Sequence, residues 1–132
     1  ARSVNYGFAR EVGSPGTSAV WFFDWLVGKS FDGFAPYGPY LVTRDEVPDP
    51  QALRVTMDLN GVRRQDGDTG QMIFTVAELV AFASRVSTLE PGDLIFTGTP
   101  AGVGAATGDF LTAGDRMEVR VGDLGVLVNT VR

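Results

Sequence analysis

Two stretches of this 132-residue chain alternate regularly between apolar and polar residues. Residues 53–59 (LRVTMDL) alternate with the period of a strand that is covered on one face. Asn60–Gly61 follows, a pair that tolerates the positive φ angles of a type I′ turn, so residues 62–65 are expected to return as the partner strand. Residues 117–121 and 126–128 are separated by glycines and predict a second hairpin near the end of the chain.

A helical period interrupts the strands once. Thr75 and Glu78 have the spacing of a capping box, in which each side chain binds the backbone amide of the other residue. Apolar residues then recur at helical spacing, which predicts a helix over 76–86. After a turn at 90–93, the apolar run 94–97 is expected to form another strand. The predicted class is therefore mostly β with one capped helix.

Composition excludes several classes of protein. The chain is 44% hydrophobic and 20% charged, which is typical of a soluble globular protein. Its net charge of -5 argues against nucleic-acid binding, and the one basic cluster, Arg63–Arg64, is expected to lie in a solvated turn with Asp66 and Asp68. No apolar run approaches the roughly 20 residues that span a bilayer. We expect a cytoplasmic protein with no membrane or nucleic-acid partner.

Two residue types are missing from the chain, namely cysteine and histidine. Disulfides, thiolate sites and Ser-His-Asp or Cys-His catalysis are therefore excluded within it. Its chemistry must come from carboxylates, arginine, tyrosine, hydroxyls, backbone amides or the single lysine, around a hard cation if a metal takes part.

Lys29 is the only lysine among eleven basic residues, and it stands in the glycine-flanked segment WLVGKSFDGF. One interpretation is a lysine whose stem covers apolar surface while its ammonium reaches water. Arginine would serve that purpose equally well, so the alternative is that a compact point charge is required to bind an anion.

A second candidate segment, residues 96–104 (FTGTPAGVG), ends a predicted strand in small residues. Glycines and threonine hydroxyls allow backbone amides to approach an anionic ligand, although plain turn formation explains the same residues. The spacing is not that of a phosphate-binding loop, and no helix is expected to follow it.

Several motifs recur in a single order: GKSFD, PDP, LNG, MIF, LEPGD and TGTPAGVG. In this order the chain resembles the fumarylacetoacetate hydrolase family, specifically the C-terminal half of its catalytic domain, from about Lys29 to the end. The resemblance implies a mixed β-roll and a homodimer. It also implies hydrolysis, decarboxylation or isomerisation of 2-oxo and 1,3-dicarbonyl acids with Mg²⁺ or Mn²⁺.

The resemblance also implies roles for particular residues. Lys29 matches the family lysine that holds a carboxylate or enolate oxygen, and Arg10 matches a catalytic arginine. Thr99, with Gly98 beside it, matches a threonine that binds a substrate carboxylate, and Phe31 is expected to line the pocket.

One position departs from the family pattern: Tyr6 stands where the family has a metal-binding aspartate. Tyrosine is a poor ligand for Mg²⁺, so no residue of the chain is assigned to a metal. The family domain also needs roughly 70 to 90 more residues upstream, so residues 1–132 are expected to be a single but partial domain.

Three interpretations follow from this departure. The chain is the C-terminal part of a metal-dependent enzyme that another segment or chain completes. Alternatively, its pocket has been repurposed for metal-free chemistry on another carbonyl substrate, with Lys29, Tyr6 and Arg10 binding the oxo group. In the third, the chain is a non-catalytic dimerising or binding β-roll.

Overall fold

The computed structural model describes residues 29–132, and the chain divides into two compact units at the boundary between Tyr37 and Gly38. In the described part of the first unit, residues 31–34 form a tight turn. The Phe34 amide donates to the Phe31 carbonyl over 3.0 Å, and Gly33 has the positive φ of 78° that favours glycine. The Phe31 and Phe34 rings pack with their centroids 5.3 Å apart.

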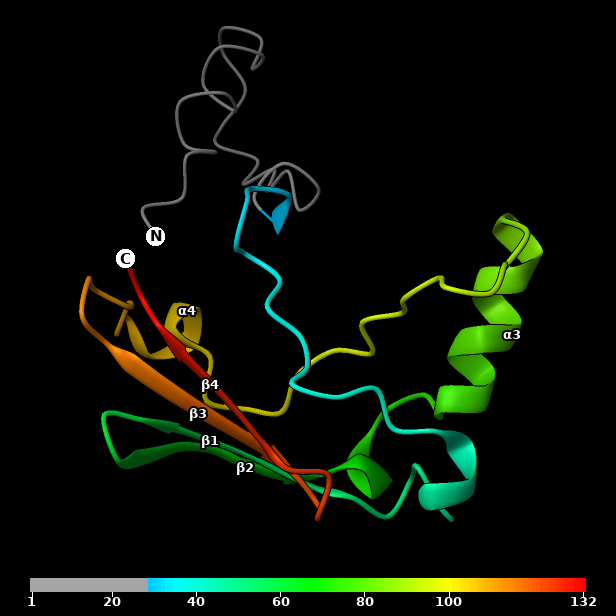
Figure 1. Cartoon of the computed structure of the whole chain (residues 1–132), viewed down its shortest axis with the longest axis horizontal. Helices are drawn as coiled ribbons and strands as arrows, with labels where there is room; N and C mark the ends of the chain where they lie inside the picture. The colour runs from blue at the N-terminus through cyan, green and yellow to red at the C-terminus, as the bar shows by residue number, and fades with distance from the viewer. Residues whose placement is uncertain (1–28) are drawn as a thin grey trace, which may run out of the picture. The chain divides into compact units, whose positions relative to one another are not determined.

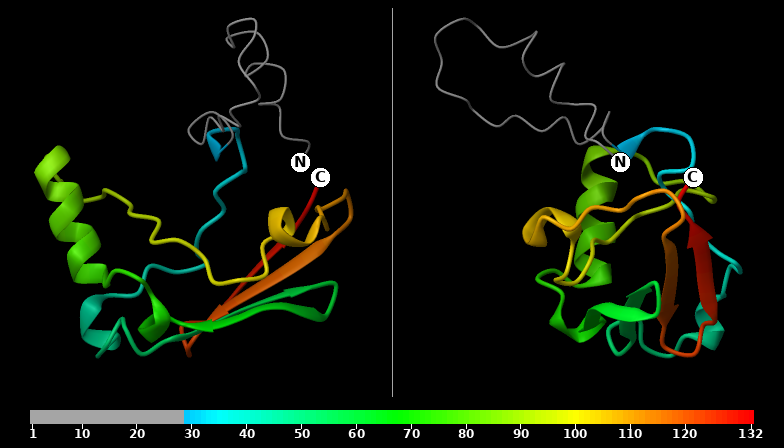
Figure 2. Two further views of the ribbon diagram at one scale, coloured as in Figure 1. Left: turned by 180° about the vertical axis from the view of Figure 1, so that it is seen from behind. Right: turned by 90° about the vertical axis from the view of Figure 1, so that its left-hand side faces the viewer.

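The second unit is built on a four-stranded antiparallel sheet with the order β2-β1-β3-β4 (Figure 1). The strands are β1 (Arg54–Leu59), β2 (Val62–Asp68), β3 (Arg116–Val121) and β4 (Val126–Thr130). Both predicted hairpins are confirmed, and Figure 2 shows the sheet from two further sides. The return strand β2 runs through Asp68, three residues further than expected.

The turn between β1 and β2 is also tied to β3. Asn60 and Gly61 have φ angles of 51° and 79°, as the type I′ prediction requires. The Asn60 amide nitrogen donates to the Arg116 carbonyl, and its side-chain oxygen accepts from the Arg116 amide, each over 2.9 Å. Its side-chain nitrogen donates to Asp115 over 2.8 Å. One asparagine thus fixes both the turn and the start of β3.

The predicted helix is confirmed as α3 (Val76–Val86), with both halves of the Thr75–Glu78 capping box formed. Gln51 links its first turn to Thr69, which follows β2, because the Gln51 side-chain oxygen accepts from the Val76 amide over 2.7 Å while its nitrogen donates to the Thr69 carbonyl over 2.8 Å. The other helices among residues 29–132 are short: η1 (Arg44–Glu46), η2 (Thr69–Gln71) and α4 (Gly104–Thr107). No helix in the described part of the chain could cross a membrane.

Two local predictions are wrong. Residues 94–97 form no strand, because no described strand lies alongside to hydrogen-bond with them. A helix does follow the glycine-rich segment, namely α4, although it has only four residues.

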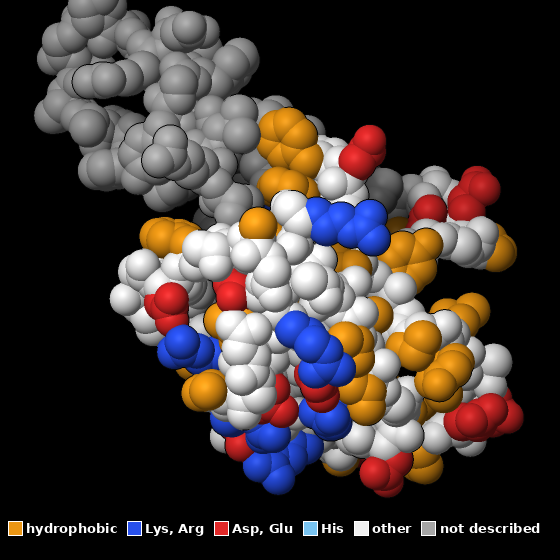
Figure 3. All heavy atoms as spheres, turned by 60° about the vertical axis from the view of Figure 1, so that its left-hand side comes forward, with side chains coloured by type: hydrophobic (Ala, Val, Ile, Leu, Met, Phe, Trp, Pro, Cys, Tyr) orange, Lys and Arg blue, Asp and Glu red, His pale blue; other side chains and the backbone are white. Residues whose placement is uncertain are grey.

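The two faces of the sheet differ in character. Val55 and Met57 of β1 point to the same face because alternate residues of a strand do so, and Val119 of β3 joins them because it pairs with Met57. Thr56 is on the other face and is, at 6% exposure, the one buried residue among those described; no hydrophobic side chain of residues 29–132 is buried. Hydrophobic side chains accordingly reach the surface beside intermixed acidic and basic ones, as Figure 3 shows.

Arg63 and Arg64 lie on β2 and not in the expected solvated turn, because the strand continues through them. Arg63 is bound to Asp58 and, over 3.4 Å, to Asp66. Arg64 is bound to Asp109 over 2.6 Å. Each arginine of the pair therefore has a carboxylate partner within the chain.

Candidate functional site

The glycine-rich segment, residues 96–104, lies against β2 at the edge of the sheet. Gln65 makes the polar contacts between them: its side-chain nitrogen donates to the Thr99 hydroxyl and to the Pro100 carbonyl, each over 2.8 Å. The Ala101 carbonyl lies 3.4 Å from the same nitrogen. Gln65 is half-buried, whereas Thr99 is exposed. One amide group thus holds three consecutive residues of the segment.

Two glycines allow this close approach. A Cβ atom on Gly102 would lie 2.1 Å from the Arg64 carbonyl oxygen, and a Cβ atom on Gly67 would lie 2.7 Å from the Cβ of Pro100. Neither distance is possible for a real side chain, so glycine is required on both surfaces. Gly98, by contrast, has a φ of 106° and open space around its Cβ position. The backbone beside Thr99 therefore remains accessible.

The far end of the segment is also fixed. The ion pair between Arg64 and Asp109 joins β2 to the residues that follow α4. A Cβ atom on Gly104 would lie 2.3 Å from the Asp109 carbonyl oxygen, so the turn of α4 also packs tightly. The Thr99 hydroxyl is consequently presented by a loop that is held at both ends.

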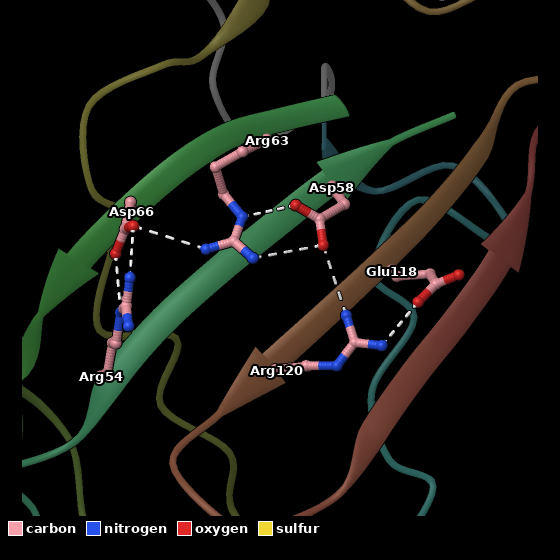
Figure 4. A network of polar contacts seen from close by, with 6 residues as sticks. All are labelled: Arg54, Asp58, Arg63, Asp66, Glu118 and Arg120. Atoms are coloured by element: carbon pink, nitrogen blue, oxygen red, sulfur yellow. Dashed lines mark hydrogen bonds and ion pairs between the residues drawn. The ribbon is translucent and has the colours of Figure 1, made fainter. Parts of the chain in front are cut away.

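The opposite, polar face of the sheet carries a ladder of alternating charges (Figure 4). Arg63 and Arg120 both reach Asp58, and Arg120 also binds Glu118 over 2.7 Å. The hydrogen bond from Arg63 lowers the pKa of Asp58 below its ordinary value. Likewise the hydrogen bond from Arg54 lowers the pKa of Asp66. These carboxylates are therefore ionised and form ion pairs with arginine.

A divalent cation needs several oxygen ligands around one point. Within residues 29–132, no group of three or more acidic side chains is arranged to hold a metal ion. The described donor set therefore does not fit a resident Mg²⁺ or Mn²⁺.

The predicted site residues fall into three groups. Thr99 and Gly98 lie together in the segment described above. Lys29 and Phe31 belong to the first unit, where Lys29 is exposed and Phe31 is 41% exposed. Arg10 and Tyr6 lie outside the described residues. Every role assigned to these residues stays a prediction.

Gln65 is the polar residue that the sequence analysis missed. It pairs with Met57 and therefore belongs to the apolar face of the sheet. Residues 62–68 contain a single hydrophobic residue and do not alternate, so no local pattern in the sequence marked Gln65; only the strand pairing shows that it is a half-buried polar group that requires a partner.

Comparison with known proteins gives the family. The family model for the C-terminal domain of fumarylacetoacetate hydrolase matches residues 9–132. A curated protein of Burkholderia cenocepacia, whose name gives no substrate, is 49% identical over 111 residues, covering 82% of this chain and 39% of the relative. The chain therefore spans about two fifths of the length of the curated relatives it matches.

Solved structures agree. A fumarylacetoacetate hydrolase from Exiguobacterium antarcticum is 44% identical with a TM-score of 0.76, covering 80% of this chain and 39% of that one. A maleylpyruvate hydrolase from Sphingobium sp. SYK-6, in complex with manganese and pyruvate, is 37% identical with a TM-score of 0.71, covering 76% of this chain and 36% of that one. Isomerases are also among the matched structures. The motifs, the mostly β fold and these matches establish that the chain belongs to the fumarylacetoacetate hydrolase family.

Proposed function

We propose that this chain supplies the substrate-holding part of an enzyme that acts on a 2-oxo or 1,3-dicarbonyl acid. The reaction is a C–C hydrolysis, a decarboxylation or an isomerisation. Thr99 binds the substrate carboxylate with the backbone beside Gly98, and Lys29 holds the enolate or carboxylate oxygen. Arg10 assists as a second cation, while Tyr6 and Phe31 contribute to substrate binding.

The observation that carries this proposal is the exposed Thr99 hydroxyl, fixed by Gln65 over 2.8 Å on a loop that matches the family. A hydroxyl held in place loses little conformational entropy when a ligand binds, so it suits recognition of a small anion. The related maleylpyruvate hydrolase was solved with pyruvate, a 2-oxo acid, which supports the same ligand class here.

The chemistry of these groups fits such substrates. All three proposed reactions place negative charge on a carbonyl oxygen of the substrate. An ammonium group at Lys29 stabilises that charge as it develops, and fixed donors do so without reorganisation during the reaction. A guanidinium at Arg10 adds paired N–H donors that suit a carboxylate.

A divalent cation is the cofactor that the family resemblance implies. A divalent cation polarises a carbonyl oxygen when it is bound, and the manganese of the related structure supports one in the family. Because the acids of residues 29–132 do not form a metal site, no step is assigned to a metal here. The corresponding alternative is that this chain is a repurposed, metal-free member of the family that acts on another carbonyl substrate.

A partner is included in the proposal, either a second copy in a homodimer or a complementing chain. Hydrophobic side chains such as Ile73 and Leu41, each 91% exposed, support it because apolar surface of this kind is normally covered in a folded protein. The same observation favours a second candidate function, a non-catalytic dimerising or binding β-roll. The cytoplasmic location stays a prediction.

The test is isothermal titration of the chain with oxalate and with pyruvate, each with and without Mn²⁺. Binding that requires Mn²⁺ supports the metal-dependent enzyme and means that ligands outside residues 29–132 complete the metal site. Binding without metal supports the repurposed pocket. If neither anion binds under either condition, the enzymatic proposal is wrong and the binding module remains.

A further inference from the structure

We infer that Gln65 is a positioning residue that makes the Thr99 hydroxyl a hydrogen-bond donor toward the ligand. The inference rests on the proposed function, in which Thr99 binds a carboxylate. It adds a residue to that site and gives a physical reason why the site would select a hydrogen-bond acceptor.

The orientation of the Gln65 amide follows from its neighbours. The Pro100 carbonyl oxygen lies 2.8 Å away and can only accept a hydrogen bond. The side-chain atom facing it must therefore be the nitrogen, because an oxygen at that distance would be repelled. The nitrogen carries two hydrogens, and the second one points to the Thr99 oxygen over 2.8 Å. The oxygen of Thr99 is consequently an acceptor in this bond.

The hydroxyl proton of Thr99 is then left for another partner. The nearest acceptor within the loop is the Pro100 carbonyl at 3.5 Å, which already accepts the shorter bond from Gln65. A hydrogen bond at that length is weak. Since Thr99 is exposed, its proton is available to an acceptor that approaches from outside the loop.

This arrangement has a consequence for specificity. A carboxylate oxygen accepts the Thr99 proton, whereas a protonated ligand amine has only N–H donors and cannot accept it, and a neutral amide accepts it only through its uncharged carbonyl oxygen. Hydrogen bonds to ionised groups are also about twice as strong as neutral ones. The pair therefore favours an anionic acid over its neutral amide.

The test measures the binding of pyruvate and of pyruvamide by titration of the full chain in Mn²⁺. Pyruvate, the anionic acid, should bind more tightly than pyruvamide, its neutral amide. Gln65→Met keeps the length of the side chain but removes the donor, and should weaken pyruvate binding about tenfold. Thr99→Val should weaken it at least as much. In the double variant, Gln65→Met should add nothing to Thr99→Val, because it acts through the hydroxyl that is already gone. Gln71→Met, an exposed glutamine of η2, is the matched control and should bind as the unsubstituted chain does.

A second readout needs no change at Gln65. Its side-chain amide signal in a ¹⁵N-resolved NMR spectrum should shift in Thr99→Val and stay near its original position in Thr99→Ser, which keeps the hydroxyl. Unchanged pyruvate binding in Gln65→Met, additive losses in the double variant, or no shift in Thr99→Val would each overturn the role of Gln65. Failure of the unsubstituted chain to bind pyruvate would instead overturn the proposed function, on which this role depends.

Discussion

Replacement of Gly102 by alanine tests whether the glycine-rich segment is docked on β2 as described. Gly102 has a φ of 103°, and its Cβ position lies 2.1 Å from the Arg64 carbonyl oxygen and 3.1 Å from the Gln65 Cγ. The carbonyl belongs to the backbone of a strand, so no rotamer change relieves the contact. Either the segment moves off β2 or the strand deforms.

The magnitude has two parts. A non-glycine residue in this conformation costs about 1–2 kcal/mol. The forced contact adds about 1–3 kcal/mol, as overpacking does in a closely packed region. We therefore expect Gly102→Ala to reduce the free energy of unfolding by about 2–5 kcal/mol.

Gly98 provides a matched control, because its φ of 106° is nearly the same and nothing lies within 4 Å of its Cβ position. Gly98→Ala should therefore show the conformational cost alone. Thermal unfolding followed by circular dichroism should place the midpoint of Gly102→Ala below that of Gly98→Ala by about 4–12 °C, at roughly 4 °C per kcal/mol. Equal midpoints, with the Gln65 amide signal unmoved in both variants, would refute the docking geometry.

Three further predictions concern residues away from this loop. Lys29→Met should abolish the binding of oxalate in titration. Because Lys29 is exposed, the variant should change the free energy of unfolding by less than about 0.5 kcal/mol. A destabilised variant that still binds oxalate would show a structural lysine instead. Asn60→Ala should destabilise the chain by about 2–4 kcal/mol in urea unfolding, because alanine makes neither side-chain hydrogen bond and tolerates the φ of 51° poorly. Asn60→Gly should lose only the hydrogen bonds and be destabilised less. The pKa of Asp58 is lowered by Arg63, so its contribution to stability should be full above the ordinary value of 3.8 and be lost as pH falls below it. In thermal unfolding from pH 2 to 7, the midpoint of Asp58→Asn should therefore fall less steeply in acid than that of the unsubstituted chain. An identical profile would contradict this.

Local sequence signals were sufficient for most of the fold. The hairpin at Asn60–Gly61 depends on the positive φ of two adjacent residues, and the start of α3 depends on Thr75 and Glu78, three residues apart. Both interactions are between near neighbours, so the sequence contains the information directly. The helix was predicted over about 76–86, in agreement with α3, for the same reason.

Predictions that required distant partners were less successful. Residues 94–97 have the composition of a strand, but a strand also needs a neighbour, which composition cannot supply. The contact between Gln65 and Thr99 joins residues 34 positions apart, and no local pattern indicates it. Arg64 pairs with Asp109 across 45 positions for the same reason.

The described residues combine fixed polar contacts with uncovered apolar surface, and the two have different physical origins. Hydrogen bonds such as those of Gln65 and Asn60 define local geometry between particular atoms, and each adds little net stability. Burial of apolar surface supplies most of the stability of a fold, yet no hydrophobic side chain of residues 29–132 is buried. Phe74 and Phe82, each 59% exposed, are examples. A partner that covers such side chains would therefore add stability without altering the hydrogen bonds that hold Thr99, so assembly and ligand recognition in this chain can be tested by separate substitutions.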